Sequence, residues 1–269
     1  STPIKSSAAS DVYKRQMCYS AIDLTTLSCN DSVTSVTEFA RKAAEFYQKY
    51  PHIPNVASIC IYPAFVETVG LAVDGTPMRI TSVGGGFPAA QTFLEVKALE
   101  VAMAVENGAD EIDIVLNVGR MLTGEYDEAA NEVEVIRSEL DEDVVLKVII
   151  ECCLLTEEEK RMLCRIVSDS GADYIKTSTG FGGGGATRED VALFAKHVGP
   201  NVKIKAAGGI ASLADAEEFI RLGADRLGTS RVVKIAMAQE QQAAEAAAAP
   251  QQPEAAAQPE TPEQQDTTY

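Results

Sequence analysis

Two lysines in the sequence occupy positions that suit a reactive amine. Lys176 and Lys205 each lie in a short apolar segment that runs into a glycine-containing turn. Burying an ammonium group is costly unless the group is paired or deprotonated, and a deprotonated amine can attack a carbonyl carbon. A second cation nearby lowers the pKa of an amine, which makes the nucleophile available near neutral pH. The two lysines therefore predict an enzyme that works through a Schiff base.

Three more charged residues interrupt apolar segments. Asp113 is one of them, and because a buried carboxylate needs a cationic partner, we expect Lys176 and Lys205 to supply it. Asp23 and Lys147 suit either an active-site contact or a supporting ion-pair network. The alternative for all of these residues is a set of ion pairs with a purely structural role.

The elements that position these residues alternate between strand and helix patterns. Apolar segments predict eight strands, at residues 21–27, 56–62, 79–83, 111–116, 144–151, around Lys176, around Lys205 and at 224–228. Helical patterns separate them, at residues 32–50, 64–73, 90–107, 126–140, 156–171, 187–199 and 212–223. Strict alternation over eight strands predicts a closed (β/α)₈ barrel, a TIM barrel. An open doubly wound sheet is the alternative, but no GxGxxG motif follows an early strand.

Glycine and hydroxyl residues follow the last two predicted strands. Gly208 and Gly209 come after the seventh strand, and Gly228, Thr229 and Ser230 come at the end of the eighth. Their backbone N–H groups and hydroxyls would suit an anion, and the loops after strands seven and eight are the usual phosphate site of this fold. The glycine-rich segment 180–185 would either close over a substrate or be flexible.

Composition limits the possible partners. The chain has 269 residues, of which 46% are hydrophobic and 23% charged, with a formal net charge of −17. This charge argues against nucleic acid and anionic membranes as partners, and no apolar run is long enough to span a membrane. The six cysteines and two histidines show no metal-site spacing, so we expect free thiols, no metal, no cofactor and a cytoplasmic location. The oligomeric state stays open, with a homodimer as one possibility.

The two ends of the chain differ from the middle. Residues 1–16 lack hydrophobic periodicity, and residues 11–16 resemble a translated sequencing adapter, so we assign residues 1–16 to a non-native or disordered leader. The barrel is expected over residues 17–238. From residue 239 to residue 269, alanine, glutamine, proline and glutamate predict a disordered tail, which finishes at Tyr269. The composition allows a helix to continue as far as residue 249, where the prolines from Pro250 onward would stop it.

Six segments together resemble deoxyribose-phosphate aldolases: IDLTTL at residues 22–27, ICIYP at 59–63, GADEID at 108–113, KVIIE at 147–151, KTSTG at 176–180 and KAAGG at 205–209. The resemblance covers residues 20–231. It implies a metal-free class I aldolase on a (β/α)₈ barrel that reversibly cleaves 2-deoxy-D-ribose 5-phosphate to acetaldehyde and D-glyceraldehyde 3-phosphate.

The same resemblance implies roles for individual residues. Lys176 would form the Schiff base, Lys205 would lower its pKa, and Asp113 would pass protons to and from Lys205. Tyr269 would assist proton transfer at the substrate carbon. Asp23 and Thr25 would contact substrate hydroxyls or order the network. The substrate and its phosphate would be held by Thr179, Gly180, Gly208, Gly209, Gly228, Thr229 and Ser230.

The chain departs from the family in two places. Cys152 stands where a threonine is usual, and the helical lead before the first strand is missing or replaced. Two other functions remain as alternatives. A transaldolase-like enzyme would share the Schiff-base lysine but not the paired lysines with Asp113. A non-catalytic barrel that binds a phosphorylated metabolite would keep the glycine turns but has no need of Lys176.

Overall fold

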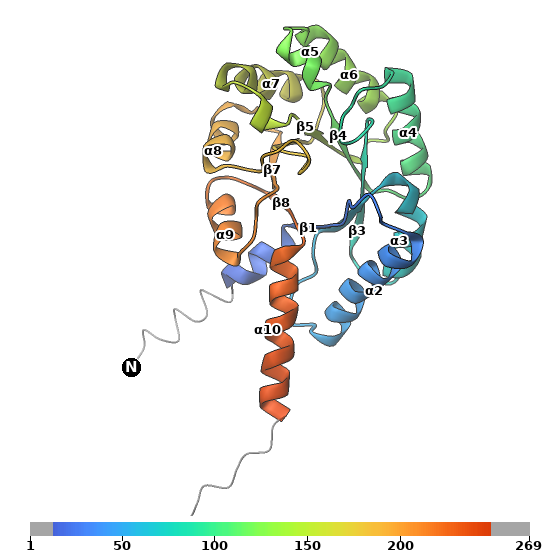
Figure 1. Ribbon diagram of the computed structural model, residues 1–269, viewed down its shortest axis with the longest axis vertical. Helices are drawn as coiled ribbons and strands as arrows, with labels where there is room; N and C mark the ends of the chain where they lie inside the picture. The colour runs from blue at the N-terminus through green and yellow to red at the C-terminus, as the bar shows by residue number, and fades with distance from the viewer. Residues whose placement is uncertain (1–12, 249–269) are drawn as a thin grey trace, which may run out of the picture.

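Eight parallel strands form a closed barrel, as the sequence predicts. The computed structural model describes residues 13–248. Each strand pairs with the next along the chain, and the last pairs with the first. The strands are β1 (Ile22–Thr25), β2 (Ser58–Ile61), β3 (Arg79–Gly84), β4 (Glu111–Val115), β5 (Val145–Ile149), β6 (Tyr174–Lys176), β7 (Lys203–Ala207) and β8 (Arg226–Thr229). Figure 1 shows them at the centre of a ring of helices.

Helices between consecutive strands cover the outside of the barrel, and one more helix follows the last strand. They are α2 (Val33–Lys49), α3 (Val66–Val73), α4 (Leu94–Glu106), α5 (Val118–Leu122), α6 (Tyr126–Ser138), α7 (Glu157–Asp169), α8 (Arg188–His197), α9 (Leu213–Arg221) and α10 (Arg231–Ala248), with 3₁₀ turns η1 (Pro63–Phe65) and η2 (Cys152–Leu154). Side-chain caps fix several helix starts. Thr156 and Glu159 form the predicted capping box of α7, and Ser212 begins α9 in the same way with Asp215.

Alternation along each strand separates two environments. Outward-facing residues such as Ile59, Ile112 and Val148 are fully buried and belong to the large apolar cluster between the strands and the helices. Every second residue instead points into the barrel, and many of these are charged. Barrel interiors are usually filled by branched apolar residues. Here an ionic network occupies that space, which places the chemistry of the molecule inside its barrel.

Some element boundaries differ from those expected. The helix predicted from residue 90 begins at Leu94, because Ala90 has φ 59° and cannot lie in a right-handed helix. Residues 13–20 are helical, so the described part of the predicted leader, residues 13–16, runs into the helix whose buried Cys18 and Tyr19 join the same core as Val233.

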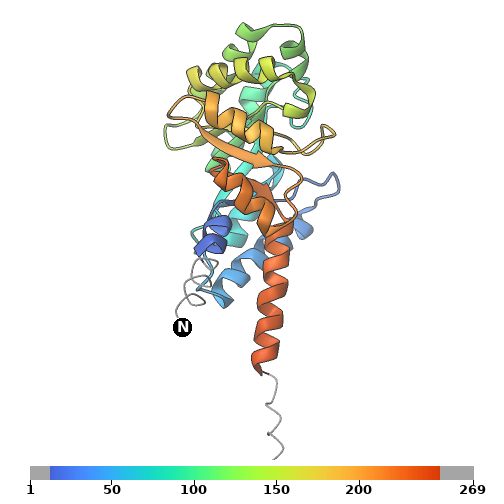
Figure 2. The same cartoon turned by 90° about the vertical axis from the view of Figure 1, so that its left-hand side faces the viewer.

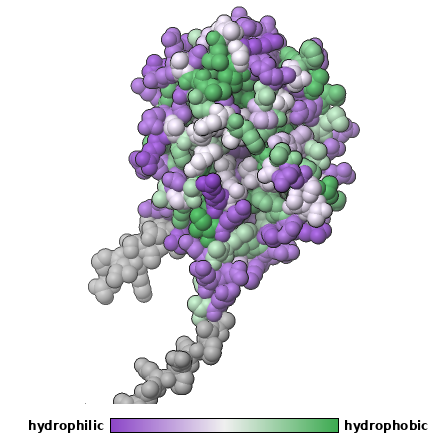
Figure 3. Space-filling model, viewed as in Figure 1, coloured by the Kyte–Doolittle hydropathy of each residue, from purple (hydrophilic) through white to green (hydrophobic). Residues whose placement is uncertain are grey.

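Helix α10 continues to Ala248, within the extension to residue 249 that the composition allows. Alanine, glutamine and glutamate favour a helix, and no proline occurs before Pro250. Figure 2 shows the helix projecting well beyond the barrel. Few strongly hydrophobic residues are visible on this projecting part (Figure 3).

Candidate active site

The strand register brings the predicted catalytic residues together. Lys176 of β6 lies beside Lys205 of β7, and Asp113 of β4 lies beside Lys147 of β5. All four side chains point into the barrel, because they occupy the inward positions of their strands.

Asp113 is the meeting point of three amines. Its Oδ2 accepts hydrogen bonds from the Nζ of Lys176 at 2.7 Å and from the Nζ of Lys205 at 2.6 Å. Its Oδ1 accepts a third, from the Nζ of Lys147 at 3.0 Å. The predicted pairing of Asp113 with both Lys176 and Lys205 is confirmed. Because the carboxylate is fully buried, these contacts replace the water that it loses on folding.

A second layer of ion pairs lies deeper in the barrel. Asp23 pairs with Lys205 and, at 2.7 Å, with Arg226 of β8. Glu111 of β4 pairs with Arg226 at 2.8 Å and with Lys147 at 2.5 Å. Lys147 therefore links the two layers, since it contacts carboxylates in both.

Burial and charge act in opposite directions on the three carboxylates. Burial alone would raise the pKa of Asp23, Glu111 and Asp113. The cations around them outweigh burial, so the pKa of each lies below its ordinary value and all three are ionised at neutral pH.

The lysines of the network do not behave alike. Burial tends to lower the pKa of Lys147 and of Lys205, but Asp113 and Asp23 outweigh it and raise both pKa values. For Lys176, burial and then the nearby charge of Lys205 prevail over Asp113, and the pKa is lowered. Lys176 is therefore the amine of this network that most readily loses its proton.

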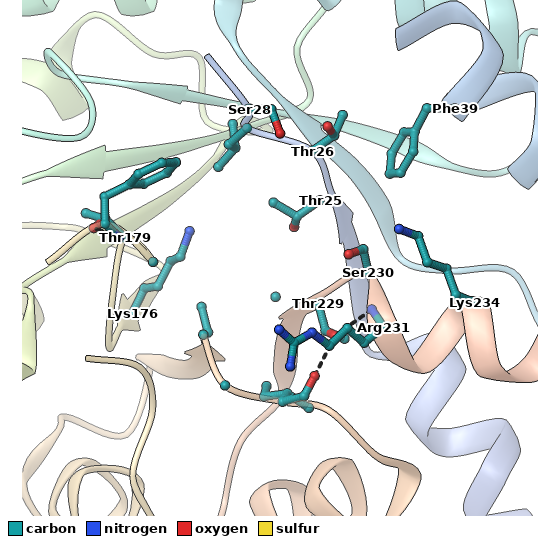
Figure 4. Close-up of a pocket in the computed structure, with 18 residues that line it drawn as sticks. Thr25, Thr26, Ser28, Phe39, Lys176, Thr179, Thr229, Ser230, Arg231 and Lys234 are labelled. Carbon is teal, nitrogen blue, oxygen red and sulfur yellow. Dashed lines mark hydrogen bonds between the residues drawn. The ribbon is translucent and has the colours of Figure 1, made fainter. Parts of the chain in front are cut away.

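A cavity of about 610 Å³ opens above Lys176 at the carboxyl ends of the strands. Lys176 lines it, whereas Lys205, Asp113 and Asp23 are completely enclosed and do not. Figure 4 shows Lys176 on one side of the cavity and Ser230, Arg231 and Lys234 on the other. A molecule in the cavity would touch one amine directly, and the rest of the network only through that amine.

The remaining predicted substrate residues lie around this cavity. Its lining includes Thr25, Thr179, Gly180, Gly208, Gly209, Gly228, Thr229 and Ser230. Asp23 was predicted to contact substrate hydroxyls or order the network, and its position fits only the second role. Tyr269, predicted to assist catalysis, lies outside the described residues.

Two cations of the cavity lining were not predicted from the sequence. Arg231 and Lys234 lie three residues apart at the start of α10, directly after the predicted phosphate residues. No aspartate or glutamate is among the described residues that line the cavity, although the chain has 40 acidic and 23 basic residues. The cavity therefore has a positive lining in a strongly negative protein.

The glycine-rich loop after β6 is held at both ends. Glu151 is buried, and its backbone has a left-handed conformation with φ 55°. Its carboxylate accepts hydrogen bonds from the backbone N–H and from the hydroxyl of Thr179. A Cβ on Gly185 would lie 2.5 Å from the backbone of Gly208, so only glycine allows this approach. These contacts anchor the loop at both ends, and its residues Gly180 and Phe181 line the cavity.

The part of the chain that the structure describes offers no group of three His, Cys, Asp or Glu side chains arranged to hold a metal ion. No described helix is long and apolar enough to cross a membrane. The described cysteines are all free thiols.

Comparison with known proteins agrees with this geometry. Residues 17–223 match the family described as DeoC/LacD family aldolase. The deoxyribose-phosphate aldolase of Clostridioides difficile (strain 630) is 49% identical over 181 residues, which are 67% of this chain and 81% of the relative. The deoxyribose-phosphate aldolase of Streptococcus pyogenes serotype M12 (strain MGAS2096) is 50% identical over 181 residues, which are 67% of this chain and 80% of the relative.

A solved structure has the same fold. The deoxyribose phosphate aldolase of Aeropyrum pernix, described as a tetramer, superposes with a TM-score of 0.70 at 29% identity, over 86% of this chain and 98% of the other. The region matched by the family contains strands β1 to β7 and the three amines around Asp113, and it ends just before β8. This chain belongs to the DeoC/LacD family of aldolases.

Proposed function

We propose that the chain reversibly cleaves 2-deoxy-D-ribose 5-phosphate to acetaldehyde and D-glyceraldehyde 3-phosphate through a Schiff base on Lys176. The observation that carries the proposal is the placement of Lys176: its pKa is lowered, chiefly by burial, and of the network amines it alone lines the cavity. The names of the relatives support the choice of substrate.

Covalent attachment comes first. The neutral amine of Lys176 adds to the C1 aldehyde of the open-chain sugar, and the resulting carbinolamine loses water to give an iminium ion. Protons must move to and from the reacting nitrogen and oxygen during this step. Asp113 lies 2.7 Å from Nζ of Lys176 and 2.6 Å from Nζ of Lys205, so it can pass a proton between the two amines.

Cleavage of the C2–C3 bond follows. The C3 hydroxyl loses its proton as the bond breaks, D-glyceraldehyde 3-phosphate leaves, and the electron pair of the bond moves toward the iminium nitrogen to form an enamine. Protonation of the enamine at C2 and addition of water then release acetaldehyde and restore the amine. The ammonium group of Lys205, whose pKa is raised by Asp113 and Asp23 against the effect of burial, keeps a proton available beside Asp113.

The phosphate fits the end of the cavity opposite Lys176. Ser230, Arg231 and Lys234 lie there (Figure 4), and Gly208 and Gly209 also belong to the cavity lining. Backbone N–H groups at a helix start and two cations together suit a dianion. A cavity of about 610 Å³ has the size of an ordinary small-molecule site.

The test is reductive trapping. Incubation with acetaldehyde and borohydride should add one ethyl group to the protein, and peptide mass mapping should find it on Lys176. Deoxyribose 5-phosphate with borohydride should modify the same lysine, because both its own iminium ion and the acetaldehyde iminium ion that follows cleavage form on Lys176. Labelling at Lys205 with Lys176 untouched would contradict the assignment. A protein that binds the sugar phosphate but is never labelled would be the non-catalytic barrel.

Removal of metal ions should not change the reaction. The iminium ion withdraws electrons from the breaking bond, which is the role that a metal ion has in other aldolases. We expect turnover of deoxyribose 5-phosphate to be the same before and after dialysis against EDTA. A loss of activity that zinc restores would instead show that a metal ion activates the carbonyl group.

A further inference from the structure

The buried network carries one more cation than carboxylates. Its carboxylates are Asp23, Glu111 and Asp113, and its basic groups are Lys147, Lys176, Lys205 and Arg226. Three carboxylates can neutralise three cations. An unbalanced charge is expensive inside a protein, so the fourth basic group is favoured to be neutral.

Contacts decide which basic group this is. Lys147 contacts all three carboxylates, while Lys205 and Arg226 contact two each. Lys176 contacts only Asp113, and it shares the same oxygen with Lys205. The surplus proton is therefore held least firmly on Lys176.

We propose that Glu111 and Arg226, in the deeper layer of the barrel, are positioning residues that set the protonation state of Lys176 by fixing the charge balance of the network. Neither lines the cavity, and neither touches Lys176. Glu111 acts through Lys147, which contacts Asp113, and Arg226 acts through Asp23, which contacts Lys205. The inference rests on the proposed role of Lys176 as the nucleophile.

Other titratable groups inside the barrel leave this balance unchanged. Cys60 of β2 stays a neutral thiol, because burial raises its pKa. Tyr174 of β6 contributes an aromatic face, with the guanidinium carbon of Arg226 5.4 Å from the ring centre. β3 contributes the hydroxyl of Thr81, which is uncharged. Arg79 also reaches Glu111, at 3.2 Å, but its side chain is 43% exposed and water compensates its charge.

The test measures the titration of Lys176 itself. Trace labelling with acetic anhydride across a pH series, read by peptide mass mapping, gives the pH at which Lys176 becomes half reactive. Arg226→Met removes a cation, so the protonated form of Lys176 then balances the network and the midpoint should rise. Glu111→Gln removes a negative charge while keeping the shape of the side chain, so the midpoint of Lys176 should fall. Each shift should be about one pH unit, as for unit charges about 10 Å apart at an effective dielectric of about 20.

Two control variants separate charge from structure. Arg226→Lys keeps a cation at this position. Arg79→Met removes the exposed cation that also pairs with Glu111. The labelling midpoint of Lys176 should stay close to the wild-type value in both variants. A lowered melting temperature in both Arg226→Met and Glu111→Gln would not explain shifts of opposite sign. Equal midpoints in these two variants, or shifts in the same direction, would overturn the inference.

A second readout separates this inference from the proposed function. The acidic limb of the pH profile of kcat/KM should move with the labelling midpoint in each variant. If the chain did not cleave deoxyribose 5-phosphate, the kinetic profile would be lost, but the labelling midpoints would still decide the charge-balance inference. If the sugar is cleaved while the midpoints stay fixed, the proposed function holds and the inference fails.

Discussion

Lys176→Met is expected to lower kcat for cleavage of deoxyribose 5-phosphate by about 10⁴-fold or more, the scale seen when a covalent nucleophile is removed. Methionine has a similar length but no amine, so no iminium ion can form. Lys147 and Lys205 cannot replace the lost amine, because both are completely enclosed and their carboxylate partners hold them protonated. The measurement is steady-state turnover, with borohydride trapping as a second assay.

The same variant should fold at least as well as the wild type. Removing Lys176 leaves three cations and three carboxylates in the network, and a methionine side chain is easily buried. Lys203→Met is the matched control, since it changes an exposed lysine two residues from Lys205 and should retain full activity. A Lys176→Met protein with an unchanged melting temperature and more than a few per cent of the wild-type turnover would refute the Schiff-base mechanism.

The sequence predicts most of the fold, because strand and helix patterns alternate in a way that few folds allow. Eight apolar segments with helices between them leave a closed barrel as the simplest arrangement, and the structure has it. The same reasoning places Lys176 and Lys205 on adjacent strands and Asp113 on β4, two strands away from Lys176. The register sets Lys176 beside Lys205, and the inward position of Asp113, which follows from the period of two along a strand, lets it contact both.

The rest of the site depends on distances that sequence patterns do not encode. Glu111 lies two residues before Asp113, so the shared inward face of β4 could have revealed it. Arg226 was missed because it lies in an otherwise ordinary strand, and its partners are residues 23 and 111, far away along the chain. Nothing in the sequence shows that Asp23 is too deep to touch a substrate. Its place below the cavity depends on packing across the barrel.

The phosphate end of the cavity should be separable from the amine end. We expect Arg231→Gln with Lys234→Gln to raise KM for deoxyribose 5-phosphate by about 10²-fold, since each lost charged contact costs about a factor of ten. Turnover at saturation should change little, because neither residue is near Lys176 in the cavity (Figure 4). Cleavage of unphosphorylated deoxyribose and borohydride trapping with acetaldehyde should be unchanged, since neither reaction involves a phosphate.

A charge-matched control is needed because the whole protein carries a net charge of −17, which repels the substrate from any side. Arg165→Gln with Lys196→Gln removes two exposed cations from α7 and α8, away from the cavity lining. This pair should change KM by less than about twofold at an ionic strength near 0.15 M, where surface charges are screened within about 8 Å. The KM of the wild type for deoxyribose 5-phosphate should also rise with added salt. The KM of the Arg231→Gln/Lys234→Gln protein should depend on salt much less. If both double variants raise KM equally, or if the unphosphorylated sugar is affected as strongly as the phosphorylated one, Arg231 and Lys234 act through general charge and do not bind the phosphate.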